Sequence, residues 1–127
     1  MRITVEAARE YFTHPSQLRH SMIEAPEDLP DWCSYYAIGG VCCVFHQGHW
    51  PGLLMVHLGV KPTAWGHVTA DARAVLGEAW AAESPERIAG WVKDSNRPMQ
   101  ALCRRLGMEI DGRLPLAEPV TLYGWRL

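Results

Sequence analysis

Three histidines and two adjacent cysteines are the residues of this chain best suited to metal chemistry, at Cys42, Cys43, His46, His49 and His57. Thiolate and imidazole groups bind zinc, and the spacings Cys-x3-His and His-x2-His both occur. No Cys-x2-Cys pair accompanies them, and alternate residues of a strand point to opposite faces of a sheet. We therefore expect these side chains to be scattered over two faces, and we predict no metal site.

Other catalytic motifs are absent from the sequence. There is no G-x-S-x-G turn, no Walker loop and no glycosidase-type pair of carboxylates,. Adjacent Cys42 and Cys43 make a poor disulfide framework, so the cysteines are expected to be reduced thiols.

The length and composition indicate an ordinary globular protein. The chain has 127 residues, of which 48% are hydrophobic and 20% charged, so residues 1–127 are expected to form a single domain around one core. No apolar run approaches the roughly 20 residues needed to cross a bilayer, and the acidic, amphipathic N-terminus does not resemble a signal peptide. We predict a cytoplasmic protein without a membrane partner.

The charge is distributed unevenly along the chain. Residues 1–86 carry five Lys/Arg against ten Asp/Glu, whereas residues 87–127 carry seven against four. A basic C-terminal part suits an anionic ligand, although an ordinary solvated surface explains it equally well. The dispersed charges lack interleaved aromatic residues, so nucleic acid is not an expected partner.

Hydrophobic periodicity predicts the secondary structure before residue 86. A helix capped by Thr4 should end at His14-Pro15, and an acidic, proline-bounded loop should cover 26–31. The remaining predicted elements are a helix over Gln17–Ala25, an antiparallel meander of strands over Tyr35–Ile38, Val41–His46 and Leu53–Val60, and a helix from Val68 to about Ala82,.

Residues 86–114 predict a strand, a polar turn, a short helix and a second strand. Arg87–Val92 alternates, and Pro98 fits the first turn of a helix. Apolar residues at Met99, Leu102, Cys103 and Leu106 recur with helical spacing. Gly107 supplies a left-handed cap, and a strand follows from Met108. Val120–Leu127 is expected to form a last strand, whose exposed edge could pair two chains into a homodimer.

This order resembles the C-terminal half of the GNAT superfamily of N-acetyltransferases, in which a strand, an Asn, a helix, Leu-Gly-Phe and a strand follow one another. Here the matching residues are Asn96 and Leu106-Gly107-Met108. The sequence of this segment is most similar to ribosomal-protein N-acetyltransferases and to small GNAT-like proteins of tailed phages. The resemblance implies an α/β fold with a mixed, mostly antiparallel twisted sheet of six to seven strands and helices on both faces. The family's first strand has only Met1–Val5 available, so it should be very short or absent.

The resemblance implies transfer of an acetyl group from acetyl-coenzyme A (acetyl-CoA) to an amine, by direct attack without an acyl-enzyme. The acceptor could be a small molecule or a peptide, and the loop Pro26–Trp32 would border its cleft.

By the same resemblance, Trp65, Gly66, His67 and Val68 occupy the position of the loop that binds the coenzyme A pyrophosphate. The family has glycines there so that backbone N–H groups can approach the phosphates. Only Gly66 remains, and Trp65 stands about where the family prefers a basic residue. The alternative is that Trp65 packs and Gly66 shapes a turn.

The resemblance also assigns roles at the reacting centre. Gly59 is expected at a strand bulge, with the amides of Leu58 and Val60 flanking the thioester, and Asn96 would bond the pantetheine arm. His57 occupies a frequent general-base position, where an ordinary imidazole pKa suits amine deprotonation, although a lone strand histidine can be purely structural.

The family's acidic Tyr is replaced by Cys103. A thiol could protonate the leaving thiolate, but core packing is the simpler expectation.

Two other functions remain open at this stage. The eroded glycine loop and missing Tyr also fit a catalytically inactive GNAT-like phage or prophage protein with a structural or morphogenesis role, which would place it in a virion. A third possibility is a protein that binds another ligand in the same cleft.

Overall fold

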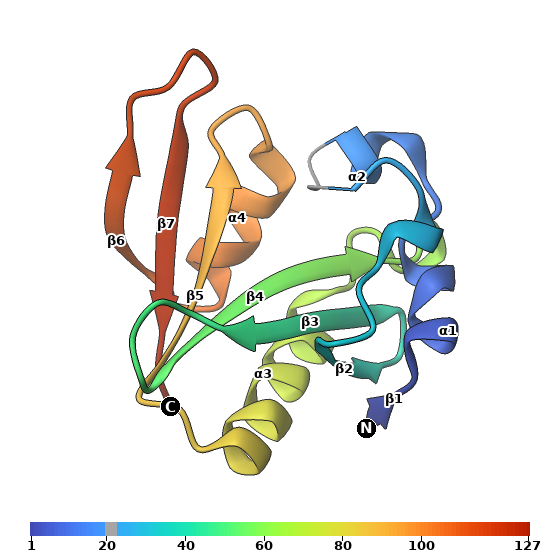
Figure 1. The fold of residues 1–127 in the computed structure, drawn as a ribbon. Helices are drawn as coiled ribbons and strands as arrows, with labels where there is room; N and C mark the ends of the chain where they lie inside the picture. Colours follow the sequence, from blue (N-terminus) through green and yellow to red (C-terminus); the bar gives the residue numbers. More distant parts are fainter. Residues whose placement is uncertain (20–22) are drawn as a thin grey trace.

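The computed structural model describes residues 1–19 and 23–127. Its centre is a seven-stranded sheet in the order β1-β2-β3-β4-β5-β7-β6 (Figure 1). The strands are β1 (Arg2–Ile3), β2 (Ser34–Ile38), β3 (Val41–Gln47), β4 (Leu53–Val60), β5 (Arg87–Lys93), β6 (Glu109–Leu114) and β7 (Val120–Trp125). The helices are α1 (Val5–Ala8), η1 (Arg9–Tyr11), α2 (Pro15–Arg19), η2 (Pro26–Asp28), η3 (Pro62–Ala64), α3 (Thr69–Glu83) and α4 (Arg97–Arg105). The predicted α/β fold class is confirmed.

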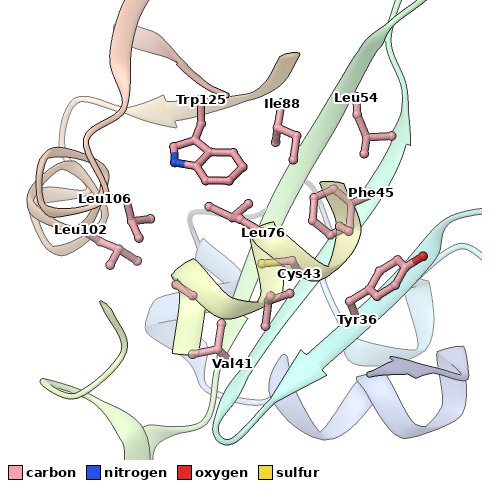
Figure 2. Close-up of a cluster of buried hydrophobic side chains, with 13 residues drawn as sticks. Tyr36, Val41, Cys43, Phe45, Leu54, Leu76, Ile88, Leu102, Leu106 and Trp125 are labelled. Carbon is pink, nitrogen blue, oxygen red and sulfur yellow. The ribbon is translucent and has the colours of Figure 1, made fainter. Parts of the chain in front are cut away.

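The sheet has a helical layer on each face. On the first face, which we call the α3 face, the side chains of β2–β5 and β7 pack against α3 and α4 in the main core, including Cys43, Phe45, Ile88, Leu76 and Trp125 (Figure 2). On the opposite face, which we call the α1 face, Tyr35, Cys42 and Val44 pack against residues of the N-terminal segment. These two faces follow from the alternation of side chains along each strand.

The meander β2-β3-β4 forms as predicted, with antiparallel pairing throughout. α3 then carries the chain across to β5, which pairs with β4 in parallel. Ala72, Val75, Leu76 and Ala79 of α3 are buried, as their helical spacing predicted,.

The N-terminal part agrees with the sequence in its first elements. β1 has only two residues, and Thr4 caps α1 by accepting a hydrogen bond from the Ala7 N–H at 3.2 Å,. The predicted helix over Gln17–Ala25 is wrong at its end. α2 is described as far as Arg19, residues 20–22 lie outside the described part, and Ala25 is not helical.

An acidic side chain accounts for the chain course after residue 23. Asp28 accepts hydrogen bonds from the N–H groups of Glu24 and Ala25, at 3.2 and 2.9 Å. The predicted loop therefore contains the short helix η2, which this carboxylate caps,.

α4 forms as predicted. Asn96 is its N-cap, with Oδ1 accepting from the Met99 N–H at 3.4 Å, and Gly107 has a φ of +77° after its last turn,. Leu102 and Cys103 are buried against the sheet.

The expectation of a free edge on the last strand is wrong. β7 lies between β5 and β6 and is paired on both sides, so β6 forms that edge of the sheet. The basis offered for a homodimer through Val120–Leu127 is thereby removed. Across the described residues, no helix has the length and apolar character required to span a bilayer.

Candidate active site

An opening between β4 and β5 is the main interruption of the sheet. The two strands pair only at Leu53–Arg87, Leu54–Ile88 and Met55–Ala89, after which no pairing joins them. At the point of divergence, a Cβ built on Gly90 would lie 2.9 Å from the carbonyl oxygen of Val56. Glycine is therefore needed there for the two backbones to approach before they separate.

The two predicted donor amides point toward this opening. The Lys61 N–H bonds Gly40 beside β3, and N–H directions alternate along a strand. The N–H groups of Val60 and Leu58 therefore point away from β3. The Val60 N–H already donates to Oε1 of Gln17 at 2.6 Å, whereas no residue of β5 pairs with Leu58.

The predicted bulge at Gly59 is wrong, because β3 and β4 pair without interruption from Val41–Val60 to Gln47–Leu54. Gly59 has a packing role instead. A Cβ at this position would lie 2.5 Å from the Phe12 ring, so its absence lets the ring lie directly on β4.

Asn96 lies beyond the end of the other arm, β5, and is partly exposed. Its Oδ1 is engaged as the α4 cap. Its Nδ2 group is left to donate to a ligand, and its predicted contact with pantetheine stays a prediction.

The loop before α3 offers fewer amides than its sequence position implies. The Trp65 N–H bonds the Pro62 carbonyl and the His67 N–H bonds the Ala64 carbonyl. Within the described residues, the N–H groups of Gly66 and Val68 make no hydrogen bond. Gly66 has a φ of +87° with open space around a built Cβ, and the Trp65 ring packs edge-on against His14 at 4.6 Å. The anion donors in this loop are therefore Gly66, Val68 and the first turn of α3.

Sequence reasoning missed a basic residue at this helix terminus. Arg105, at the end of α4, donates from Nε to Oγ1 of Thr69 at 3.0 Å, and Arg73 donates to the Arg105 carbonyl at 2.8 Å. The first turn of α3 also contains one acid, Asp71, which packs against Gly39. Because Arg105 lies 36 residues from Thr69, local sequence patterns carry no signal of this contact.

His57 stands on the α1 face of β4, where that strand leaves β5. It is paired with Val44, and its Nε2 lies 3.1 Å from Nε2 of His46 on β3. The centroids of the two imidazole rings lie 5.3 Å apart with the ring planes 17° from parallel, and the Trp32 ring meets His46 edge-on at 5.8 Å. Burial, and secondarily the neighbouring His46, lowers the pKa of His57 below its ordinary value,. His57 is therefore held neutral, as a base must be.

Trp91 lies across the opening from His57. By alternation from the paired residues Met55 and Ala89, both side chains stand on the α1 face,. Trp91 is 45% exposed and Trp32 is 72% exposed. The indoles of Trp32 and Trp91 and the imidazoles of His46 and His57 thus lie on the α1 face, beside the opening.

The structure does not support Cys103 as an acid. Its side chain is 4% exposed and packs with Val92 and Tyr123. Burial raises the pKa of its thiol to about 12. The thiol therefore acts as a small apolar residue of the core, which was the simpler of the two expectations.

Two other features lie outside the opening. A polar pocket of about 230 Å³ lies between α4 and the β6–β7 hairpin, lined by Asp94, Arg97, Gln100, Arg104, Arg113 and Thr121. Arg104 lines this pocket, whereas Arg105, the next residue of α4, points about 100° away from it around the helix axis,. In the described part of the chain, no three His, Cys, Asp or Glu side chains gather as metal ligands.

Comparison with solved structures identifies the fold. Aminoglycoside acetyltransferase AAC(6')-Ib, solved with coenzyme A, superposes with a TM-score of 0.74 at 13% identity, covering 98% of this chain and 92% of that one. A probable GNAT acetyltransferase from Chromobacterium violaceum gives 0.72 at 13% identity, covering 98% and 80%. Ribosomal-protein-S5-alanine acetyltransferase from Vibrio fischeri gives 0.69 at 12% identity, covering 98% and 90%.

No family sequence model and no curated protein matches the chain. The solved structures show that the chain has the GNAT fold of acetyltransferases, including ribosomal-protein acetyltransferases. The sequence identities are too low to transfer a function from these structures to this chain.

Proposed function

We propose that this protein is an N-acetyltransferase that moves an acetyl group from acetyl-CoA to an amine. The observation that carries the proposal is the opening between β4 and β5, with the Leu58 and Val60 amides on one arm and Asn96 beyond the other. Structures with this fold include an acetyltransferase solved with coenzyme A. That likeness supports the enzyme over a phage structural protein.

The residues around the opening fit such a cosubstrate. The Leu58 N–H can donate to a carbonyl, and the Val60 N–H can do so once Gln17 is displaced. The N–H groups of Gly66 and Val68, with the guanidinium of Arg105, can hold phosphate oxygens at the start of α3. His57 can accept the proton of the acceptor amine. Acetyl-CoA supplies the thioester, whose carbonyl carbon is the electrophile.

The acceptor remains a small-molecule or peptide amine. The aromatic side chains Trp32 and Trp91 favour an amine carried on an apolar or cationic body. We retain a cytoplasmic location as the sequence-based expectation.

Isothermal titration with acetyl-CoA tests the proposal, with desulfo-coenzyme A as the analogue control. We expect micromolar affinity in the wild type and about a ten- to hundredfold loss in Arg105→Ala, because a charge-assisted phosphate contact is worth about 1.5–3 kcal/mol. Arg104→Ala is the matched control, because it removes the same charge one residue away, from the separate pocket. Asn96→Ser keeps an N-cap oxygen but lacks the amide NH2, so it should weaken binding without unfolding α4.

Absence of binding in the wild type, with an unchanged melting temperature at high acetyl-CoA, would overturn the proposal. Equal losses in the Arg104 and Arg105 variants would remove the α3 terminus from the phosphate site.

A further inference from the structure

The contacts of His46 determine which of its nitrogens carries a proton. Its Nδ1 lies 3.1 Å from the backbone carbonyl oxygen of Gln47. A carbonyl oxygen can only accept, so Nδ1 must be the donor, and a neutral imidazole carries a single N–H. The Nε2 atom of neutral His46 therefore holds a lone pair.

The contact between the two rings also determines which nitrogen of His57 carries its proton. The two Nε2 atoms are 3.1 Å apart, and one of them must donate,. Because Nε2 of His46 is the acceptor, His57 donates from Nε2 and its Nδ1 carries the lone pair. Among the residues that the structure describes, none bonds this Nδ1.

A shared metal ion is the alternative explanation of two imidazole nitrogens at this distance. Zinc sites use three or four protein ligands, and residues 1–19 and 23–127 contain no group of three His, Cys, Asp or Glu side chains placed to hold a metal. The hydrogen-bonded pair is therefore the better account of the contact.

We propose that His46 fixes the tautomer of His57 and takes up the proton displaced when His57 deprotonates the acceptor amine. This inference rests on the proposed acetyl transfer. His46 does not contact the substrate in this scheme, so it is a positioning residue that acts through His57.

The proton movements balance in this scheme. The amine forms a C–N bond to the thioester carbonyl carbon, the C–S bond breaks, and its electron pair leaves on sulfur, where the thiolate is protonated by solvent. Nδ1 of His57 takes the amine proton while its Nε2 proton passes to Nε2 of His46. His46 is then an imidazolium whose Nδ1–H still bonds the Gln47 carbonyl. Loss of one proton to solvent, and return of the Nε2 proton to His57 as Nδ1 is released, restores the starting pair.

The surroundings of His57 leave His46 as its electrostatic partner. In the described part of the chain, His46 is the one charged or titratable group that shifts the pKa of His57. Trp32 beside His46, and Trp91 on the facing strand, carry no titratable group. Among residues 1–19 and 23–127, no carboxylate shifts the pKa of His57, so none replaces His46 in orienting the ring.

Nitrogen-15 NMR of the free protein reads the tautomers of the two rings directly. We expect His46 with its proton on Nδ1 and His57 with its proton on Nε2. His46→Gln offers an amide oxygen that can still accept from His57, so the His57 tautomer should persist. His46→Phe keeps an aromatic ring without an acceptor, so His57 should become a mixture of tautomers and its pKa should rise toward the ordinary value.

Kinetics supply the second readout. His46→Phe should lower kcat by about ten- to a hundredfold and shift the acid limb of the pH profile upward, with KM for acetyl-CoA unchanged. His46→Gln should keep the orientation of His57 but lose the proton acceptor, and so give an intermediate kcat.

Two results would overturn the proposal: a wild-type His57 with its proton on Nδ1, or an unaltered His57 tautomer and pKa in His46→Phe. If no amine is acetylated, the proposed function is wrong and the proton-acceptor role of His46 is lost with it. The NMR spectrum still decides the tautomer in that case, so the two failures are distinguishable.

Discussion

The Gln17 side chain occupies one of the two backbone amides that point toward the opening. Its Oε1 accepts from the Val60 N–H, and its Nε2 donates to the Tyr11 carbonyl. It therefore ties α2 to the end of β4 through a backbone amide that the GNAT resemblance assigns to the cosubstrate. A ligand that uses this amide has to displace Gln17, whereas a ligand that bonds Leu58 does not. The Leu58 amide is accordingly the more accessible donor.

The lowered pKa of His57 predicts how stability depends on pH. Burial and His46 disfavour the charged form in the folded state, so below the ordinary pKa of about 6.5 the unfolded chain binds more protons. The contribution of neutral His57 is complete above that pH and declines as pH falls toward the lowered folded pKa. We expect the unfolding free energy to drop with acidification across this window, and the drop to be smaller in His57→Gln.

Urea unfolding at several pH values between about 5 and 8 measures this effect. His49→Gln, at an exposed position, should leave the pH dependence as in the wild type. A wild-type slope in the His57→Gln protein would show that another group causes the acid sensitivity.

At the scale of elements, the parts that sequence predicted best are those determined locally. The bounds of α4 follow from Asn96 and Gly107 together with the apolar spacing between them, all within one short segment,. The meander β2-β3-β4 follows equally from local alternation and turns.

The parts that sequence missed depend on distant partners. Gly59 fits a bulge as well as it fits close packing, and the Phe12 ring that decides the matter lies far earlier in the chain. The place of β7 inside the sheet depends on pairing with two other strands. The Arg105–Thr69 contact likewise joins two helices that are separate in sequence.

Two glycines predict opposite effects of the same substitution. Gly77 lies within α3 with open space around a built Cβ, so Gly77→Ala should raise the unfolding free energy by about 0.5–1 kcal/mol. Gly124 lies under the ion pair of Arg87 and Asp111, and a Cβ there would lie 1.9 Å from Oδ2 of Asp111. Gly124→Ala should therefore lower it by about 1–3 kcal/mol.

Chemical denaturation of both variants checks these values, with Gly112→Ala as the control on the neighbouring strand, where a Cβ meets no atom within 4 Å. A neutral Gly124→Ala would mean that the Arg87–Asp111 pair moves aside without loss.

At the scale of the whole molecule, the opening must form without separating the two halves of the sheet. Strand pairing joins β4 and β5 over only three residue pairs. The main core also connects the two halves. Leu54 and Phe45 from one half and Ile88 and Trp125 from the other meet there with the helices α3 and α4 (Figure 2). The core thus closes the α3 face near the point where the strands diverge.

Trp125 is the buried tryptophan of this connection and carries the last prediction. It is 8% exposed, and its indole packs edge-on against Trp80 of α3 at 5.6 Å. Trp125→Ala should lower the unfolding free energy by about 3–5 kcal/mol, whereas Trp50→Ala, at a residue 73% exposed, should change it little. Denaturant unfolding followed by circular dichroism measures both without relying on tryptophan fluorescence. Because Trp125 joins β7 to α3, its loss should also weaken acetyl-CoA binding at the distant opening, and intact affinity in a destabilised Trp125→Ala protein would show that the two arms keep their spacing without this core contact.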